Sequence, residues 1–345
     1  MADDVVLVTG ASGYIAGHVI LQLLERGYRV RGTLRSLTRA DEVRGWLERA
    51  AGNPFGDRLE FVAAELTSDA GWAEAMQGVR FVQHIASPIP PGLPKHPDEL
   101  IVPARDGTLR VMGTAAAAEV ERVVQTSSTA AITYGHANPN GHVFTEADWT
   151  NPDHPDTVPY VRSKAIAERA AWDALPTLSR RLEWAVVNPA LVIGPVLDKD
   201  ASASIAVVSK MLNGEIPGLP RFGFPMVDVR DLADLHLRAM ERPEAAGERF
   251  LGSGPFMWLS DVAAVLKQRL GARAKRVPTR KLPDFLVRIV GRFDPEIRGQ
   301  LFELGKVRRA SSEKAERMLG WTQRPIEGSI VDTAESLFAV GAIKP

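Results

Sequence analysis

Residues 5–16 read VVLVTGASGYIA: four apolar residues, a turn containing Gly10 and Gly13, and the start of a helix. A β-branched run without polar alternation is typical of a strand buried on both faces. Apolar side chains then recur at helical spacing as far as Arg26, and Gly27 ends that helix. Residues 29–34 read as a second strand, so this stretch predicts a β-α-β unit with a glycine turn after its first strand.

The same alternation continues along the first half of the chain. The pattern predicts strands at 59–63, 79–85, 122–126 and 182–187, and helices at 70–76, 103–119 and 161–175. This order predicts an α/β fold of the Rossmann type, a doubly wound parallel sheet with helices on both faces.

The pattern changes after residue 190, where glycine and proline become frequent. A helix is predicted near 205–212, a short strand returning to the sheet at 226–229, a helix at 231–240, and mostly short helices after 252. We therefore expect a dinucleotide-binding domain of residues 1–190 plus about 226–250. A smaller, discontinuous, mostly helical substrate-binding lobe comprises about 191–225 plus 251–345, closing over the sheet edge where such folds bind ligands.

Composition excludes several function classes. The 345 residues include 42 basic and 42 acidic side chains and no cysteine. Zero net charge gives no field for nucleic acid or an acidic membrane, and the absence of cysteine excludes disulfides and thiolate chemistry. No histidine–acid cluster has metal-ligand spacing, so we expect no metal. Without a leader pattern or a long apolar stretch, we expect a cytoplasmic protein that acts on a small molecule, as a monomer or a homodimer.

The turn after the first strand suits a dinucleotide. Gly10 allows a tight turn, Gly13 lets backbone N–H groups approach a pyrophosphate, and Ala16 lets helix and strand pack closely. The second strand ends in Arg35, with Arg39 just beyond and no acid before Asp41. An arginine there favours a 2′-phosphate. The sequence therefore predicts NADPH, with NADH less favoured.

Tyr160 and Lys164 lie one helical turn apart and share a helix face. A lysine cation beside a phenol favours the phenolate, so we expect a lowered pKa for Tyr160 and an acid–base role near neutral pH. Ser127 and Ser128 follow a predicted strand, and Ser128 can present its hydroxyl to a substrate carbonyl. A turn residue that bonds its own backbone is the other interpretation of Ser128.

With these motifs in place, the chain resembles an extended short-chain dehydrogenase/reductase, most of all the dihydroflavonol-reductase-like group with its bacterial and fungal aldehyde and ketone reductases. The resemblance covers nearly the whole chain. It rests on residues 8–13, 84–88, 106–108, 126–128, 160–172, 187–189, 227–231 and 319–321.

The resemblance implies a role for each matching position. Tyr160 protonates the carbonyl oxygen, Lys164 binds the nicotinamide ribose, and Ser128 hydrogen-bonds the substrate oxygen. Glu65 and Leu66 stand where the family has an Asp-hydrophobic pair against adenine, with Glu65 replacing the usual Asp. The remaining implied cofactor contacts are Ser12, Tyr14, Ile15, Ile85, Ala86, Ser87, Thr126, Pro189, Ala190, Leu191 and Val192.

The substrate side is less determined by the sequence. Expected pocket residues are Pro88, Ser128, Thr129, Thr133, Tyr160, Pro225 and Met226, and the apolar run at 222–226 suggests an apolar or aromatic carbonyl substrate. His84 reads as a core histidine, Asp228 and Asp231 as braces of a strand–helix junction, and Trp321 as core.

Three alternatives to a carbonyl reductase stay open. The first is an epimerase or dehydratase of a sugar-like substrate that retains its cofactor. The second is a redox-sensing nucleotide-binding protein without catalysis. A reductase of coenzyme A thioesters ranks lower, because residues 155–160 lack the Asn-Trp-Tyr-Cys signature of plant cinnamoyl-CoA reductases.

Overall fold

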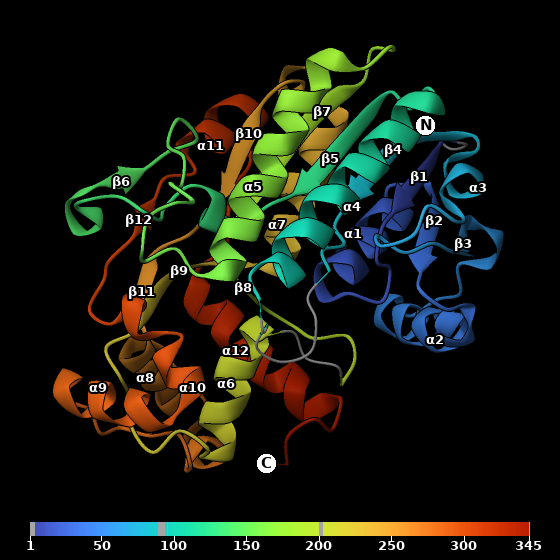
Figure 1. Cartoon of the computed structure of the whole chain (residues 1–345). Helices are drawn as coiled ribbons and strands as arrows, with labels where there is room; N and C mark the ends of the chain where they lie inside the picture. Colours follow the sequence, from blue (N-terminus) through green and yellow to red (C-terminus); the bar gives the residue numbers. More distant parts are fainter. Residues whose placement is uncertain (1–3, 89–93, 95, 200–202, 345) are drawn as a thin grey trace.

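The computed structural model describes residues 4–88, 94, 96–199 and 203–344. Its centre is a seven-stranded sheet in which all neighbouring strands run parallel (Figure 1). In spatial order the strands are β10 (Arg249–Gly252), β7 (Glu183–Pro189), β5 (Arg122–Thr126), β4 (Val79–His84), β1 (Val5–Val8), β2 (Arg29–Leu34) and β3 (Leu59–Ala63). This confirms the predicted Rossmann-type fold.

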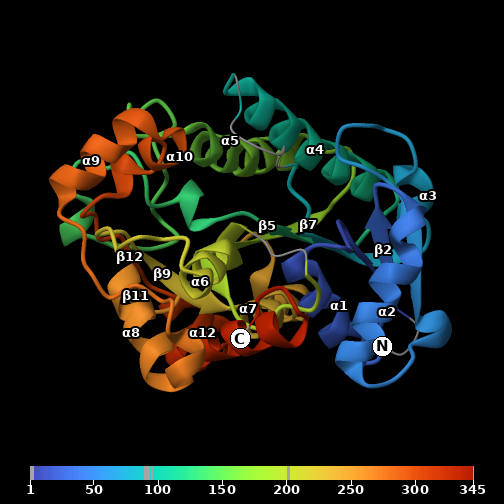
Figure 2. The same ribbon diagram turned by 90° about the horizontal axis from the view of Figure 1, so that it is seen from below.

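Helices cover both faces of the sheet, as Figure 2 shows from below. One face packs against α1 (Tyr14–Glu25), α2 (Ala40–Ala51) and α7 (Val229–Glu241). The other packs against α3 (Trp72–Met76), α4 (Asp98–Ala117) and α5 (Pro159–Ala174). Two separate apolar cores on the two faces explain why the strands read as continuous apolar runs.

A second lobe has its own apolar core. Its helices are α6 (Ala203–Asn213), α8 (Leu259–Leu270), α9 (Asp284–Phe293), α10 (Pro295–Arg298) and α12 (Ile326–Ala339). They pack around a small sheet of β11 (Phe256–Trp258), β9 (Gly223–Asp228) and β8 (Leu191–Ile193). The predicted return of residues 226–229 to the main sheet is therefore wrong: β9 pairs with β8 and β11, and β10 is the strand that extends the main sheet.

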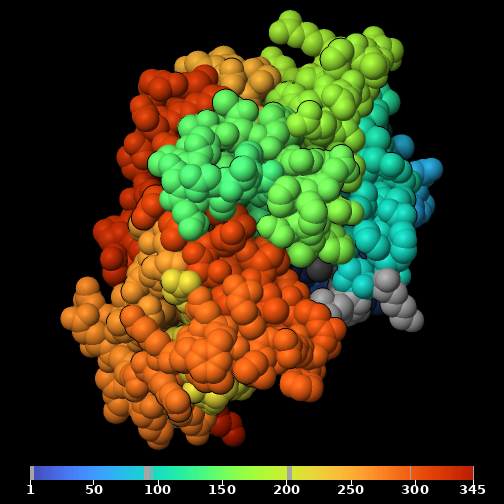
Figure 3. Space-filling view, turned by 60° about the vertical axis from the view of Figure 1, so that its left-hand side comes forward, coloured from blue at the N-terminus to red at the C-terminus, as the bar shows by residue number. Residues whose placement is uncertain are grey.

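The two parts also interlock. A parallel pair of β6 (Val143–Phe144) and β12 (Arg309–Ala310) joins the segment after β5 to the second lobe. In Figure 3 the green residues of that segment lie directly against the orange residues of the lobe. Near the C-terminus, α11 (Glu313–Leu319) and the fully buried Trp321 pack into the core beneath α7, which confirms the prediction for Trp321.

Two helices differ from the sequence prediction. The helix expected from residue 103 begins at Asp98, and Pro103 lies inside it. A proline there lacks the N–H that would bond to the preceding turn and crowds the carbonyl of Glu99, and burial of Leu100 and Ala104 offsets this cost. Helix α2 was not predicted, although Val43, Trp46 and Leu47 recur at helical spacing and all three are buried.

Candidate active site

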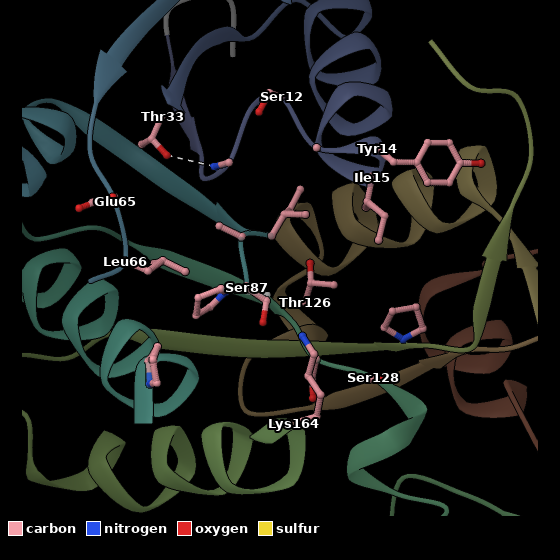
Figure 4. A pocket seen from close by; sticks show the side chains of 18 of the residues that line it. Ser12, Tyr14, Ile15, Thr33, Glu65, Leu66, Ser87, Thr126, Ser128 and Lys164 are labelled. Atoms are coloured by element: carbon pink, nitrogen blue, oxygen red, sulfur yellow. Dashed lines mark hydrogen bonds between the residues drawn. The ribbon is translucent and has the colours of Figure 1, made fainter. Parts of the chain in front are cut away.

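A cavity of about 850 Å³ opens at the carboxyl ends of the central strands. In a parallel sheet, the loops that follow the strands and the N-termini of the next helices lie at this edge, which is where α/β sheets bind ligands. Figure 4 shows Ser12, Thr126, Ser128 and Lys164 around this one cavity, although they come from three separate segments. The cavity volume lies within the range of small-molecule and cofactor sites.

The glycine turn lies against the cavity and is built for close approach. Gly10 has φ +68°, and a Cβ there would lie 3.0 Å from the Cβ of Ala86. Its N–H donates to Oγ1 of Thr33 on β2 at 3.0 Å, the bond drawn in Figure 4. Gly13 caps α1 without a side-chain hydrogen bond, and the first turn of α1 contains no acid. The positive end of the helix is thus open to an anion, and these residues fit a pyrophosphate.

The two arginines after β2 have different surroundings. Arg35 is exposed and lines the cavity. Arg39 instead forms an ion pair with Glu42, with Nε 3.0 Å from Oε2, and does not line the cavity. The structure therefore places one of the two predicted phosphate-binding arginines at the site. Glu65 and Leu66 both line it at the end of β3.

Ser128, Tyr160 and Lys164 line the same cavity as the glycine turn. Ser128 follows β5 and caps a short 3-10 turn, where its Oγ accepts the N–H of Ala130 at 3.1 Å. Tyr160 is in the first turn of α5 with its side chain 42% exposed, and the Lys164 Nζ lies 6.0 Å from the centroid of its ring. The predicted proton-transfer group is thus assembled from the end of β5 and one face of α5.

The electrostatics of this group differ from the expectation. Burial of the hydroxyl raises the pKa of Tyr160, and a hydrogen bond with Ser128 lowers it by a smaller amount. The predicted lowering of this pKa is therefore wrong, because desolvation of the phenolate outweighs the hydrogen bond with Ser128. Burial also lowers the pKa of Lys164 to about 8, partly opposed by the charge of Glu168. At neutral pH the phenol is protonated and most of Lys164 is charged.

Several other predicted residues have structural roles. Burial lowers the pKa of His84 to about 3, and its Nδ1 lies 3.1 Å from Oγ1 of Thr9, so it is a neutral core histidine as predicted. Asp228 caps α7 and accepts the N–H of Arg230 at 2.7 Å. Asp231 accepts the backbone N–H of Arg324 at 2.7 Å. Both acids brace the junction, as predicted.

The remaining cofactor predictions lie at the cavity. All of the following line it: Gly10, Ser12, Gly13, Tyr14, Ile15, Ile85, Ala86, Ser87, Thr126, Pro189, Ala190, Leu191 and Val192. Sequence reasoning missed Thr33, Leu34, Ala64, Thr67, Trp72, Glu99, Pro103, Ser127 and Ser204, which line it as well. Most of these flank motif residues, and no motif marks Glu99, Pro103 or Ser204.

The substrate side is placed less well by the sequence. Pro88 lines the cavity, but Thr129, Thr133, Pro225 and Met226 do not. Thr133 is buried and its Oγ1 donates to the carbonyl of Thr129 at 3.1 Å. Met226 packs in the core of the second lobe. Apolar character alone does not distinguish a pocket wall from lobe packing.

Two features are absent from the described part of the chain. No helix within it is long and apolar enough to cross a bilayer. Among the same residues, no group of three or more histidine, cysteine or acidic side chains is arranged to hold a metal ion.

The fold and the site together define a Rossmann-type protein with a serine, a tyrosine and a lysine beside its dinucleotide turn. The family model described as "NAD dependent epimerase/dehydratase family" matches residues 6–251, and the chain belongs to this family. This confirms the resemblance drawn from the sequence and the prediction of a nicotinamide dinucleotide cofactor.

Several relatives are reductases by name. "Cinnamoyl-CoA reductase CAD2" of Medicago truncatula is 32% identical over 97% of this chain and 95% of its own. "Cinnamoyl-CoA reductase 1" of Petunia hybrida is 35% identical over 78% of each chain. Among solved structures, the yeast methylglyoxal/isovaleraldehyde reductase Gre2 complexed with NADPH superposes with a TM-score of 0.80 at 27% identity, covering 98% of this chain and all of the other.

Proposed function

We propose that this protein is an NADPH-dependent reductase that converts aldehydes or ketones into alcohols. The observation that carries the proposal is the meeting of Ser128, Tyr160 and Lys164 with the glycine turn in one cavity. Such a cavity holds a bound nicotinamide and a carbonyl next to a proton donor, which is what carbonyl reduction requires.

Each residue of the site has its own role in the proposed reaction. When bound, the dihydronicotinamide supplies the hydride that reduces the carbonyl carbon. Tyr160 donates its phenolic proton to the carbonyl oxygen, and its raised pKa keeps that proton in place near neutral pH. Ser128 donates a hydrogen bond to the same oxygen, where negative charge develops. Lys164 holds the nicotinamide ribose and stabilises the phenolate left on Tyr160 until a proton returns from solvent.

The choice of NADPH rests on Arg35. It lines the cavity at the end of β2, and no acid that would select the free ribose hydroxyls occurs between that strand and Asp41. A guanidinium there pairs with a 2′-phosphate through two N–H groups. Binding of NADPH by the yeast relative supports the same choice.

The substrate is proposed to be an apolar or aromatic carbonyl compound. Leu191, Val192 and Pro88 give the cavity apolar walls beside the catalytic group. Reduction of an aromatic coenzyme A thioester is a second candidate, favoured by the names of the plant relatives. The missing Asn-Trp-Tyr-Cys signature before Tyr160 ranks it below simple aldehydes and ketones.

The test is carbonyl-dependent loss of NADPH absorbance with a panel of aldehydes, ketones, one dihydroflavonol and cinnamoyl-CoA, repeated with NADH. Stoichiometric oxidation, faster with NADPH, is the expected result. Turnover of the thioester alone would select the second candidate. Tight cofactor binding with no carbonyl turnover would reject the proposal in favour of an epimerase, a dehydratase or a redox sensor.

A further inference from the structure

One fully buried carboxylate lies behind the catalytic group. Glu168 is on α5, one turn after Lys164 and two turns after Tyr160, so all three side chains lie along one helix face. The side chain of Glu168 is 0% exposed. A buried ionised carboxylate is costly unless its oxygens are hydrogen-bonded and its charge is balanced, so its partners are informative.

Both oxygens of Glu168 are held by donors from three adjacent strands. Ser127 Oγ, after β5, donates to Oε2 at 2.5 Å. Asn188 Nδ2, on β7, donates to the same oxygen at 2.7 Å. Arg249 Nε, on β10, donates to Oε1 at 2.5 Å, and its guanidinium lies 3.7 Å from the ring centroid of Trp149. One carboxylate thus ties α5 to the ends of β5, β7 and β10.

Two of the three donors adjoin residues of the proposed site. Ser127 precedes Ser128, which hydrogen-bonds the carbonyl oxygen in the mechanism above. Asn188 precedes Pro189 at the cavity and also donates to the carbonyl of Ser128 at 3.2 Å. Charge-assisted hydrogen bonds of this kind are strong and directional. A shift of the carboxylate would therefore move the hydroxyl of Ser128 relative to Tyr160.

We propose that Glu168 is a positioning residue that fixes Ser128 and Pro189 against α5 and sets its own carboxylate one helical turn from Lys164. The proposal rests on the reductase function proposed above, because it assigns Glu168 a part in the same site. Glu168 touches neither substrate nor cofactor: it does not line the cavity.

The effect on Lys164 is electrostatic. Burial lowers the pKa of Lys164 to about 8, and the negative charge of Glu168 opposes that fall. Two neighbouring groups, Tyr160 on α5 and His84 on β4, carry no charge near neutral pH. Arg249 on β10 is paired with Glu168 itself, and Glu99 on α4 lines the same cavity as Lys164. Loss of the carboxylate charge therefore lowers the pKa of Lys164 further and leaves more of it neutral.

The main test compares Glu168→Gln with the wild-type enzyme. The charged lysine is lost as pH rises through its pKa, so the basic limb of the kcat/KM profile for NADPH-dependent reduction should move to lower pH, by roughly one unit. In the cofactor-free protein, acetylation of Lys164 by acetic anhydride near neutral pH, followed by peptide mass spectrometry, should be roughly fivefold faster. The other lysine peptides serve as internal references.

Glu183→Gln is the matched control. Glu183 pairs with Arg122, whose Nη2 lies 2.5 Å from Oε2, on the same strands β5 and β7 but at their opposite end. Both variants remove the carboxylate partner of an arginine, and both should lose thermal stability. Only Glu168→Gln should change the pH limb and the labelling of Lys164. An equal loss of activity at all pH values, with unchanged labelling, would reduce Glu168 to a structural role and overturn the proposal.

Ser127→Ala keeps the test informative if Glu168→Gln does not fold. This variant retains the carboxylate and its charge, and it removes only the bond beside Ser128. We expect kcat to fall roughly tenfold with no movement of the basic limb. Unchanged kcat would contradict the positioning role. Labelling of Lys164 needs no turnover, so it separates failure of this inference from failure of the reductase function.

Discussion

Gly10→Ala tests whether the glycine turn is a phosphate cradle. Gly10 has φ +68°, and an added methyl carbon would lie 3.0 Å from the Cβ of Ala86, at the wall of the cavity. The left-handed backbone costs an L-residue about 1–2 kcal/mol, so the variant should lose that much free energy of unfolding. The methyl group would also press on Ala86, which lines the cavity, and so displace the turn proposed to hold the pyrophosphate. We expect the Kd for NADPH to rise at least tenfold, about 1.4 kcal/mol.

Gly27→Ala provides the matched control for this prediction. Gly27 has φ +89°, and nothing lies within 4 Å of an added Cβ there, because it is at the far end of α1. It carries the same backbone penalty without reaching the cavity. The assays are chemical denaturation and fluorescence titration with NADPH. Equal Kd values for wild type and both variants, with the expected stability losses, would refute the phosphate cradle.

Three further substitutions, one of them a control, test the charges of the site. Arg35→Ala should raise the KM for NADPH about tenfold or more and the KM for NADH much less, because only NADPH carries the 2′-phosphate. The control is Arg39→Ala, which breaks the ion pair with Glu42 and should change neither KM. Since the pKa of Lys164 is lowered to about 8, its charge destabilises the fold below that pH, and the penalty fades as pH rises toward the unfolded-state value. Lys164→Met should therefore stabilise the cofactor-free protein at neutral pH, by roughly 3 kcal/mol at most, and less at high pH; an unchanged difference in unfolding free energy across pH would contradict this reasoning.

Local patterns predicted the sheet well for a physical reason. Strands buried on both faces need continuous apolar runs, and β1, β3 and β5 occupy the residues that those runs mark. The glycine turn was equally visible, since Gly10 adopts a backbone conformation that other residues resist. Residues 226–229 were assigned to the wrong sheet because the apolar pattern of a short strand carries no information about which sheet it joins.

Some features of the candidate site could likewise be predicted from the sequence, and others could not. Motif residues near the sheet edge were found because the fold brings the ends of parallel strands together. The raised pKa of Tyr160 could not be predicted, because it depends on how deeply the hydroxyl is buried, and spacing reports only the nearby lysine. The hydrogen bonds of Glu168 could not be predicted either, because they join it to Ser127, Asn188 and Arg249, which lie up to 81 positions away in the chain.

The most direct test of the account is the turnover of Tyr160→Phe with NADPH and the best carbonyl substrate of the wild-type enzyme. The substitution removes only the hydroxyl that is proposed to donate the proton, at a residue that is 42% exposed, so folding should be preserved. The account predicts a loss of at least about 10²-fold in kcat with a Kd for NADPH close to that of the wild type. Near-normal turnover by the phenylalanine variant would contradict the central claim.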